Sequence, residues 1–550
     1  STDSLTFADG YTKTTTVNID NTDTVVNNAK ITLSVAASAA NLESADNTVI
    51  TGSSSTTNDS LTITAGTGTV ATSSRITNVN KITIADAGDA TSGATGLSGS
   101  DLTIDLASYG TALEIDASAL DAANKDNDSS GAINESDASA EKLTITGTSA
   151  KALTVTGGGS DDTIIGSSDA DAGDTLKGGA GADTFTMAGN LTYADTIDGG
   201  AGTDTLHSSA AVTDVQFMNV SNVETLDLTS AGADRAIALG SYFTSAGITT
   251  VNVDGSHVST VTATGTTTGV KYVVDGANNV DDSVTGGLGD DTISYDNTTL
   301  LTAADTFVGG AGTDTIEIRN TGGAVTATIG LAESTGFEKV VVADADGGDT
   351  AGAEDADAIS ITFEGETTAG IDADNSTDDT DVLIEADASV ITDTNDTVTI
   401  TAADILDTDY IFTIKGGAAA DSLTGGGGAD TITGNGGIDT LKGGGGADTI
   451  SGGDGADLIE GNAGADTLTG GAGNDDFIYA LTESTNAKTD TITDFTTGSD
   501  EVRIKVTAPS GASTFDLTNK GDTTNVSEGI ALLSSAVGQY VFNTSTNEVM

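Results

Sequence analysis

The sequence predicts an all-β protein in which solenoid segments of stacked short repeats are combined with β-sandwich or further β-solenoid domains. Nine-residue units rich in glycine and aspartate recur along the chain, and internal repeats of this kind are typical of solenoids. Between them run short stretches in which Thr alternates with Val, Ile or Leu, the pattern of β-strands. The chain holds 71 Gly and a single Pro, so its turns must rely on Gly, Asn and Asp.

The chain is too long, at 550 residues, for one hydrophobic core, so several domains or an extended solenoid are expected. Aromatic residues make up only 4%, and the core must therefore use small aliphatic side chains. The changes in pattern predict five segments: a β-rich domain with an inserted acidic loop at 1–150, repeat tracts alternating with β-strand modules at 151–345, a β-rich linker domain at 346–415, a roll of repeats at 416–480, and a C-terminal capping β segment at 481–550.

The formal net charge is −65, from 83 acidic and 18 basic residues. Such a chain has no basic face for nucleic acid, and an anionic lipid surface would repel it. A solvated acidic surface or a disordered tail would also give this charge, but regularly spaced Asp favours a chain that binds many cations. No apolar stretch is long enough to span a membrane. Cysteine is absent, and in a secreted protein metal is the usual substitute for disulfides.

The clearest repeat begins at Gly416 and comprises seven consecutive units of nine residues, such as GGGGADTIT and GNGGIDTLK. An Asp holds the sixth place and an apolar residue the eighth place of every unit. The sixth-place residues are Asp421, Asp430, Asp439, Asp448, Asp457, Asp466 and Asp475. The eighth-place residues are Leu423, Ile432, Leu441, Ile450, Ile459, Leu468 and Phe477. A Gly-rich flexible linker does not predict this regularity.

Two shorter tracts carry the same unit, one beginning at Gly157 and one at Gly286. The first places Asp162, Asp174, Asp183, Asp195 and Asp204 in the role of the sixth residue. The second places Asp291, Asp305 and Asp314 there. We predict that all these aspartates are metal ligands.

The spacing within the unit predicts structural calcium. Glycines permit positive φ, so the backbone can turn tightly and aim its carbonyls inward, and Asp adds a hard oxygen ligand of the kind that suits Ca²⁺. Aspartates on adjacent turns would lie about 4.8 Å apart, the strand spacing. At that distance two unit charges repel by about 0.9 kcal/mol in water and about 3.5 kcal/mol at an effective dielectric of 20. Interleaved ions would turn this repulsion into coordination, which couples folding to metal binding.

These units resemble the repeats-in-toxin (RTX) family. The segments DDFIYALTES (475–484) and DTITDFTTGSDEVRI (490–504) look like the cap that closes such rolls in secreted proteases and lipases. The resemblance implies a right-handed parallel β-roll or β-helix with two repeats per turn. It also implies export by a type I secretion system that reads a C-terminal signal.

A different calcium loop is predicted at 126–137, where the residues match D-x-D-x-[DNS]-G-x₅-[ED]. The matching positions are Asp126, Asp128, Ser130, Gly131, Asn134 and Asp137. Asp replaces the usual final Glu, and flanking helices are not evident, so the site would be a loop inserted between strands. The alternative is a solvated acidic turn.

No catalytic motif is evident, and we expect the protein not to be an enzyme. The only histidines, His207 and His257, do not form H-E-x-x-H, no serine lies in G-x-S-x-G, and there is no thiol. A tail of a secreted enzyme is therefore the least favoured of the RTX roles.

The repeats alternate with a second module. GGAGTDTL (199–206) is followed by FMNVSNVETLDLTSAGA (217–233), and GGAGTDTI (309–316) by STGFEKVVVADA (334–345). This order, together with GTSAKALTVTGG (147–158), resembles Caulobacter-type surface-layer proteins. The resemblance implies a calcium-dependent, self-assembling two-dimensional lattice on the surface of a Gram-negative cell. Attachment to lipopolysaccharide would require a segment that has no counterpart here. The alternative is a secreted RTX adhesin or biofilm-matrix protein with an added ligand-binding module.

Overall fold

The computed structural model divides the chain into two units, one of residues 1–254 and 261–270, the other of residues 255–260 and 271–550. The structure describes residues 151–168, 173–187, 191–228, 235–254, 259–275, 282–296, 305–320, 325–331, 335–344, 358–364, 382–406, 408–480, 490–496 and 499–506. Outside these ranges it describes the strands named below and residues 117 and 118. Within this part of the chain, no helix has the length and apolar character needed to cross a membrane.

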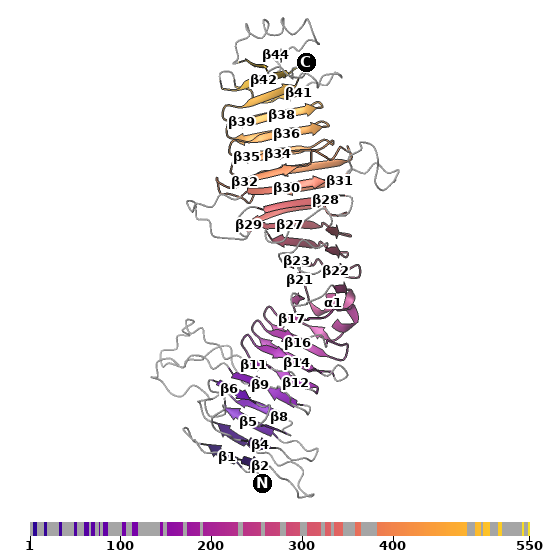
Figure 1. The fold of residues 1–550 in the computed structure, drawn as a ribbon, viewed down its shortest axis with the longest axis vertical. Coiled ribbons are helices and arrows are strands. Elements are labelled where there is room, and N and C mark those ends of the chain that lie inside the picture. The colour runs from indigo at the N-terminus through magenta and orange to yellow at the C-terminus, as the bar shows by residue number, and fades with distance from the viewer. Residues whose placement is uncertain are drawn as a thin grey trace, which may run out of the picture. The chain divides into compact units, whose positions relative to one another are not determined.

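The first unit is built on two parallel sheets whose strands alternate along the chain (Figure 1). One sheet contains β5 (Ser60–Thr64), β8 (Lys81–Ala85), β10 (Leu113–Asp116), β12 (Leu153–Thr156), β14 (Thr175–Ala180), β16 (Thr196–Ala201) and β18 (Val220–Ser221). The other contains β6 (Gly68–Ala71), β9 (Leu102–Asp105), β11 (Leu143–Thr146), β13 (Thr163–Ile165), β15 (Thr184–Thr186), β17 (Thr205–His207), β19 (Thr225–Asp227) and β21 (Thr250–Asp254). Each crossing between the sheets is one half-turn of a solenoid.

Smaller elements complete the first unit. β1 (Ser4–Phe7) pairs with β3 (Thr32–Val35), and β2 (Thr16–Asn18) with β4 (Val49–Thr51), which pairs with β7 (Ile76–Thr77). Later in the chain this unit contains the 3₁₀ helix η2 (Asp214–Phe217), β20 (Arg235–Ala238) and α1 (Ser241–Ala246). Phe217 and Phe243 fix η2 to α1 through an edge-to-face ring contact at 5.5 Å. β22 (Ser259–Thr262) spans the division between the units.

The second unit repeats the two-sheet plan. One parallel run contains β23 (Lys271–Asp275), β25 (Thr292–Asp296), β27 (Thr315–Asn320), β29 (Lys339–Asp344), β31 (Val382–Asp387), β33 (Tyr410–Lys415), β35 (Thr431–Gly436), β37 (Thr449–Asp454), β39 (Thr467–Ala472) and β41 (Asp490–Ile492). The opposite run contains β28 (Val325–Gly330), β30 (Ala358–Glu364), β32 (Thr397–Thr401), β34 (Ser422–Thr424), β36 (Thr440–Gly445), β38 (Leu458–Ala463), β40 (Asp476–Ala480) and β42 (Glu501–Val506). β24 (Ser283–Thr285) and β26 (Thr306–Val308) form a further parallel pair.

Antiparallel strands follow both runs. β43 (Phe515–Asn519) pairs antiparallel with β42, and β45 (Glu548–Val549) pairs antiparallel with β41 and with β44 (Phe542–Asn543). The predicted all-β fold with parallel β-roll segments is confirmed. The five segments predicted from the sequence stay a prediction.

The register shows how many residues make one turn. In the seven-unit segment, Ile432 lies opposite Ile450, and Ile450 opposite Leu468, so a turn takes two nine-residue units. In the first unit the offset is 21 residues between Thr163 and Thr184 but 25 between Thr225 and Thr250. It is 23 residues between Thr292 and Thr315. The strands therefore stay in register while the connections between them vary in length.

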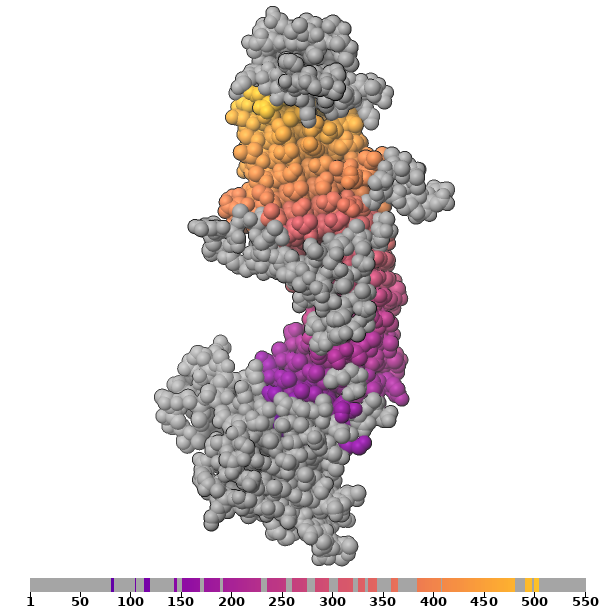
Figure 2. Space-filling view, viewed as in Figure 1, coloured from indigo at the N-terminus to yellow at the C-terminus, as the bar shows by residue number. Residues whose placement is uncertain are grey.

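The eighth residue of each unit forms the core. All seven eighth-place side chains, from Leu423 to Phe477, are 0% exposed, because successive copies stack directly on each other across the ladder. On the face drawn in Figure 2, the residues from 382 to 480 pack into one continuous surface. The core of this segment is thus two stacked rows of single apolar side chains.

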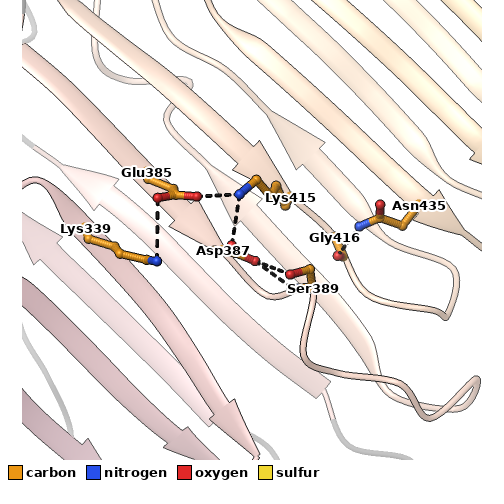
Figure 3. A network of polar contacts seen from close by, with 7 residues as sticks. All are labelled: Lys339, Glu385, Asp387, Ser389, Lys415, Gly416 and Asn435. Carbon is orange, nitrogen blue, oxygen red and sulfur yellow. Dashed lines mark hydrogen bonds and ion pairs between the residues drawn. The ribbon is translucent and has the colours of Figure 1, made fainter.

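Cross-strand ion pairs cover the outer face of the sheet where β29, β31 and β33 meet (Figure 3). Lys339 lies 3.6 Å from Glu385, while Lys415 bridges Glu385 and Asp387, the second at 3.0 Å. Exposed pairs of this kind each contribute roughly 0.2–1 kcal/mol. They favour the register but add far less than the buried core.

We predict that Ile459→Ala lowers the free energy of unfolding in saturating Ca²⁺ by about 2–5 kcal/mol, because it opens a cavity in the fully buried row. The neighbouring Leu458 is only partly buried and occupies a place that Thr takes in most units. Leu458→Thr is the matched control, with an expected change within about 0.5 kcal/mol. Urea unfolding followed by circular dichroism measures both, and equal losses would contradict the core assignment.

Candidate calcium sites

The repeat aspartates stack in rows because one carboxylate oxygen of each binds the backbone one turn earlier. Oδ1 of Asp439 accepts a hydrogen bond from the backbone N–H of Asp421 at 2.8 Å, and Oδ1 of Asp457 accepts one from Asp439 at 2.9 Å. In the first unit Oδ1 of Asp183 accepts from the N–H of Asp162 at 2.7 Å. These hydrogen bonds explain how carboxylates can be buried in the wall of a solenoid.

The second carboxylate oxygen divides the aspartates into two classes. In the first class Oδ2 accepts an N–H from its own loop, as Asp421 does from Gly417 at 2.6 Å. The other members are Asp162, Asp174, Asp195, Asp291 and Asp430. In the second class, within the residues described, Oδ2 is buried and has no hydrogen-bond partner. Its members are Asp183, Asp204, Asp314, Asp439, Asp448, Asp457 and Asp475.

The loop conformation separates the same two classes. Each aspartate of the second class follows a loop with two left-handed residues, such as Gly444 (φ 108°) and Gly446 (φ 101°) before Asp448. The described loop from Gly425 to Gly428, before Asp430, has no left-handed residue. Only Gly, Asn and a few other residues adopt this conformation readily, which is why the unit is rich in glycine. The left-handed loop conformation thus marks the turns whose carboxylate lacks a donor.

A backbone carbonyl oxygen of the next turn lies beside Oδ2 of several aspartates in both classes, as that of Gly434 does beside Asp421, but in the second class Oδ2 has no donor. A Cβ atom placed on Gly443 would clash with both Oδ2 of Asp448 and the carbonyl oxygen of Gly461 on the next turn. The same pairing surrounds Gly452, where Oδ2 of Asp457 and the carbonyl oxygen of Gly470 converge. Two acceptors that share one small space, with no donor between them, fit a hard cation.

The donor set is the one that Ca²⁺ prefers. Among the residues described, no three His, Cys, Asp or Glu side chains come together as a metal cluster. A cation in these turns would therefore be held by single carboxylates and by backbone carbonyls of adjacent loops, all of them oxygen ligands. The ion would neutralise the negative charge of the buried carboxylates.

Burial also changes the protonation of these groups. Loss of solvent raises the pKa of Asp448 to about 8, and repulsion from Asp466 and Asp430 adds to the rise. Burial likewise raises the pKa of Asp439 and Asp183 to about 7. Without a cation, these side chains are therefore held partly as neutral acids near pH 7.

All fifteen repeat aspartates predicted from the sequence lie in these rows. Besides the two classes above, Oδ1 of Asp305 accepts from the N–H of Asp282, and Oδ1 of Asp466 from the N–H of Asp448. The loop before Asp466 holds left-handed Asn462 (φ 66°). Their role as ligands stays a prediction. The predicted loop of Asp126, Asp128, Ser130 and Asp137 lies outside the described residues.

Several members of the rows were not predicted. Asp490 and Asp500 continue the two rows beyond the seven units, accepting from the N–H groups of Asp466 and Asp475. Asp282 precedes the row of the middle tract. Each of these three begins an Asp-polar-aliphatic triplet (DTI, DEV or DSV), as most Asp residues of the repeats do. This triplet, which here lacks the preceding glycines, was the sequence signal that could have identified them.

The comparisons with known proteins agree with this geometry. Residues 154–172, 171–186, 191–210, 277–297, 302–317, 413–441 and 442–477 match the family described as RTX calcium-binding nonapeptide repeat (4 copies). The chain carries RTX repeats. Such repeats bind Ca²⁺ and are typical of extracellular proteins that Gram-negative bacteria export by type I secretion. No curated protein and no solved structure matches the chain. The repeats thus indicate a secreted, calcium-dependent RTX protein.

We predict that metal-free protein loses stability as pH rises from about 4 to about 8. A carboxyl group with a raised folded-state pKa stabilises the fold fully below its usual value of 3.8, and this contribution is lost as pH rises through the folded pKa values of about 6 to 8. Thermal melts of metal-stripped protein from pH 4.5 to 8.5 measure it. High NaCl is the control, because it screens exposed charges more than buried ones. A melting temperature that rises with pH in high NaCl would contradict the prediction.

We further predict opposite effects for one aspartate of each class. Asp448→Asn should weaken calcium binding but raise the stability of metal-free protein at pH 8, because it removes a buried charge whose Oδ2 has no donor. Asp421→Asn should destabilise metal-free protein by about 1–3 kcal/mol, because its new NH₂ group must face the N–H of Gly417 or of Val398.

Calcium titration calorimetry and urea unfolding of the two variants provide the test. Asp448→Asn should lose the more calcium affinity of the two. Equal effects in both assays would mean that the two loop conformations do not differ in metal binding.

Proposed function

We propose that this RTX protein is a structural, non-catalytic surface-layer protein that assembles with calcium into a two-dimensional lattice on the bacterial cell. The observation that carries the proposal is the way repeats and strand modules share one ladder. Repeat strand β17 pairs directly with module strand β19, with Thr205 opposite Thr225, and β27 pairs with β29, with Thr315 opposite Lys339. The motif order that resembles surface-layer proteins is thus built into continuous sheets.

The charge distribution supports assembly through a divalent cation. The protein carries 83 acidic and 18 basic residues. Several of the described basic side chains are already paired within the molecule, including Lys271 with Glu317, Lys442 with Glu460 and Arg503 with Asp476. These paired basic side chains are therefore not free to attract the acidic surface of a second copy. Ca²⁺ bridging exposed carboxylates would overcome the repulsion at short range, whereas Na⁺ only screens it.

One observation favours the alternative role of an RTX adhesin or biofilm-matrix protein. Tyr193 and Tyr242 are 64% and 40% exposed, and Val215 and Met218 on or beside η2 are also exposed. Exposed apolar side chains that gather in one patch mark binding surfaces. The adhesin would use the same calcium-stabilised scaffold but bind a ligand as a monomer.

We predict that millimolar Ca²⁺ drives lattice formation where NaCl at the same ionic strength does not. Light scattering followed by negative-stain electron microscopy measures the assembly. Tyr193→Ser combined with Tyr242→Ser is the matched variant. It should assemble normally if the lattice depends on calcium bridges.

Two outcomes would contradict the proposal. Protein that is folded in Ca²⁺ but stays monomeric at high concentration would favour the adhesin. Equal assembly in NaCl would mean that screening suffices and that calcium bridges between copies are not needed.

A further inference from the structure

Two glutamates take the place of the next aspartate where a repeat tract meets a strand module. β17 and β19 pair with Thr205 opposite Thr225, so Glu224 occupies the position that corresponds to Asp204 one turn earlier. β27 and β29 pair with Thr315 opposite Lys339, so Glu338 corresponds to Asp314. The family match ends at residues 210 and 317, before either glutamate.

The hydrogen bonding of the two glutamates is that of a repeat aspartate. Oε2 of Glu224 accepts the backbone N–H of Asp204 at 2.8 Å, and Oε2 of Glu338 accepts that of Asp314 at 2.8 Å. Within the repeats, Oδ1 of Asp204 accepts the N–H of Asp183 at 2.7 Å. The carboxylate rows therefore continue into the strand modules, although the nine-residue repeat has ended.

The backbone before each glutamate also imitates a repeat loop. Asn222 (φ 52°) and Gly336 (φ 67°), each two residues before the glutamate, are left-handed. A Cβ atom on Gly199 would clash with the carbonyl oxygen of Asn222 and with Oδ2 of Asp204. A Cβ atom on Gly309 would clash likewise with the carbonyl oxygen of Gly336 and with Oδ2 of Asp314.

The same pair of oxygens occurs inside the repeats. Around Gly178, the carbonyl oxygen of Gly199 converges with Oδ2 of Asp183. The short sequences NVE (222–224) and GFE (336–338) thus present the carbonyl and the carboxylate that a further repeat would present.

An orphaned carboxylate oxygen lies at each of these junctions. Asp204 and Asp314 are both 0% exposed, and Oδ2 of each is buried without a hydrogen-bond partner. One Asp and one Glu together carry the two negative charges that balance one divalent ion. The arrangement recurs in both units with different sequences in the intervening spacers.

We propose that Glu224 and Glu338 each complete a calcium site at the end of a repeat tract. The first site takes Oδ2 of Asp204, the carbonyl oxygen of Asn222 and the carboxylate of Glu224. The second takes Oδ2 of Asp314, the carbonyl oxygen of Gly336 and the carboxylate of Glu338. Each strand module thus supplies the carbonyl and the carboxylate that complete the last calcium site of the repeat tract before it. The proposal rests on calcium binding by the repeats and not on lattice assembly.

The test uses the full chain with Glu224→Gln, Glu338→Gln and the double variant. Glutamine keeps an oxygen that can accept the N–H of Asp204 or Asp314, so a purely structural role would survive while the charge on the ion would be lost. Glu317→Gln is the control, because Glu317 lies three residues after Asp314 but pairs with Lys271 on the outer face of the sheet. Native mass spectrometry counts the bound Ca²⁺ ions, and titration calorimetry gives their affinities.

Each single Gln variant should bind one ion fewer than the unmodified chain, and the double variant two fewer. The Glu317→Gln variant should bind the full number. Unchanged ion counts and affinities in the Gln variants, or an equal loss in Glu317→Gln, would overturn the proposal.

If the Gln variants do not fold, Glu224→Asp and Glu338→Asp test whether the two glutamates are calcium ligands. They keep the charge but shorten the side chain, and each should weaken the affinity for one ion by about tenfold or more. An unchanged affinity in both would overturn the proposal. Because assembly is not measured here, failure of the lattice proposal would leave these results unaffected.

Discussion

The buried carboxylate row is the interaction on which the rest of the structure depends. Parallel strands place equivalent residues about 4.8 Å apart, so an Asp at the same place in every unit is brought close to its like-charged neighbour on the next turn. A backbone N–H one turn earlier satisfies one oxygen of the stacked carboxylates, as that of Asp421 does for Asp439 and that of Asp430 for Asp448. The other oxygen needs either an N–H from its own loop or a cation, and the loop conformation decides which of the two it meets.

This choice gives the roll two kinds of turn. The turns at Asp421 and Asp430, at the start of the seven-unit segment, close through their own loop N–H groups. In the later loops before Asp439, Asp448, Asp457 and Asp475, two residues are left-handed, and Oδ2 of each of these aspartates has no hydrogen-bond donor. We therefore expect the first turns to hold their shape without metal and the later turns to depend on it. A scaffold of this kind suits a protein exported to a calcium-rich exterior, because its charge opposes folding until the ion is present.

The strand modules are continuous with the repeats and do not form a separate layer. Their strands add to the same sheets, their apolar residues such as Leu226 and Val340 enter the same cores, and their glutamates continue the carboxylate rows. This continuity explains why repeats and modules can alternate along a chain without a new hydrophobic core at each junction.

The sequence by itself determined the all-β class, the core at the eighth place and the Asp rows, because a strict nine-residue period leaves a solenoid few ways to stack. It did not reveal the two classes of aspartate, because Asp430 and Asp448 follow the same letters, GGGGAD, and differ only in loop conformation. Nor did it reveal that Asp490, Glu224 and Glu338 continue the rows, because their spacing departs from nine and only strand register places them. The short α1 helix was likewise not predicted. Its Phe243 packs against Phe217, and only the tertiary structure brings these two rings together. Tertiary structure decided these features because stacking is set by which strands pair and not by the number of residues between them.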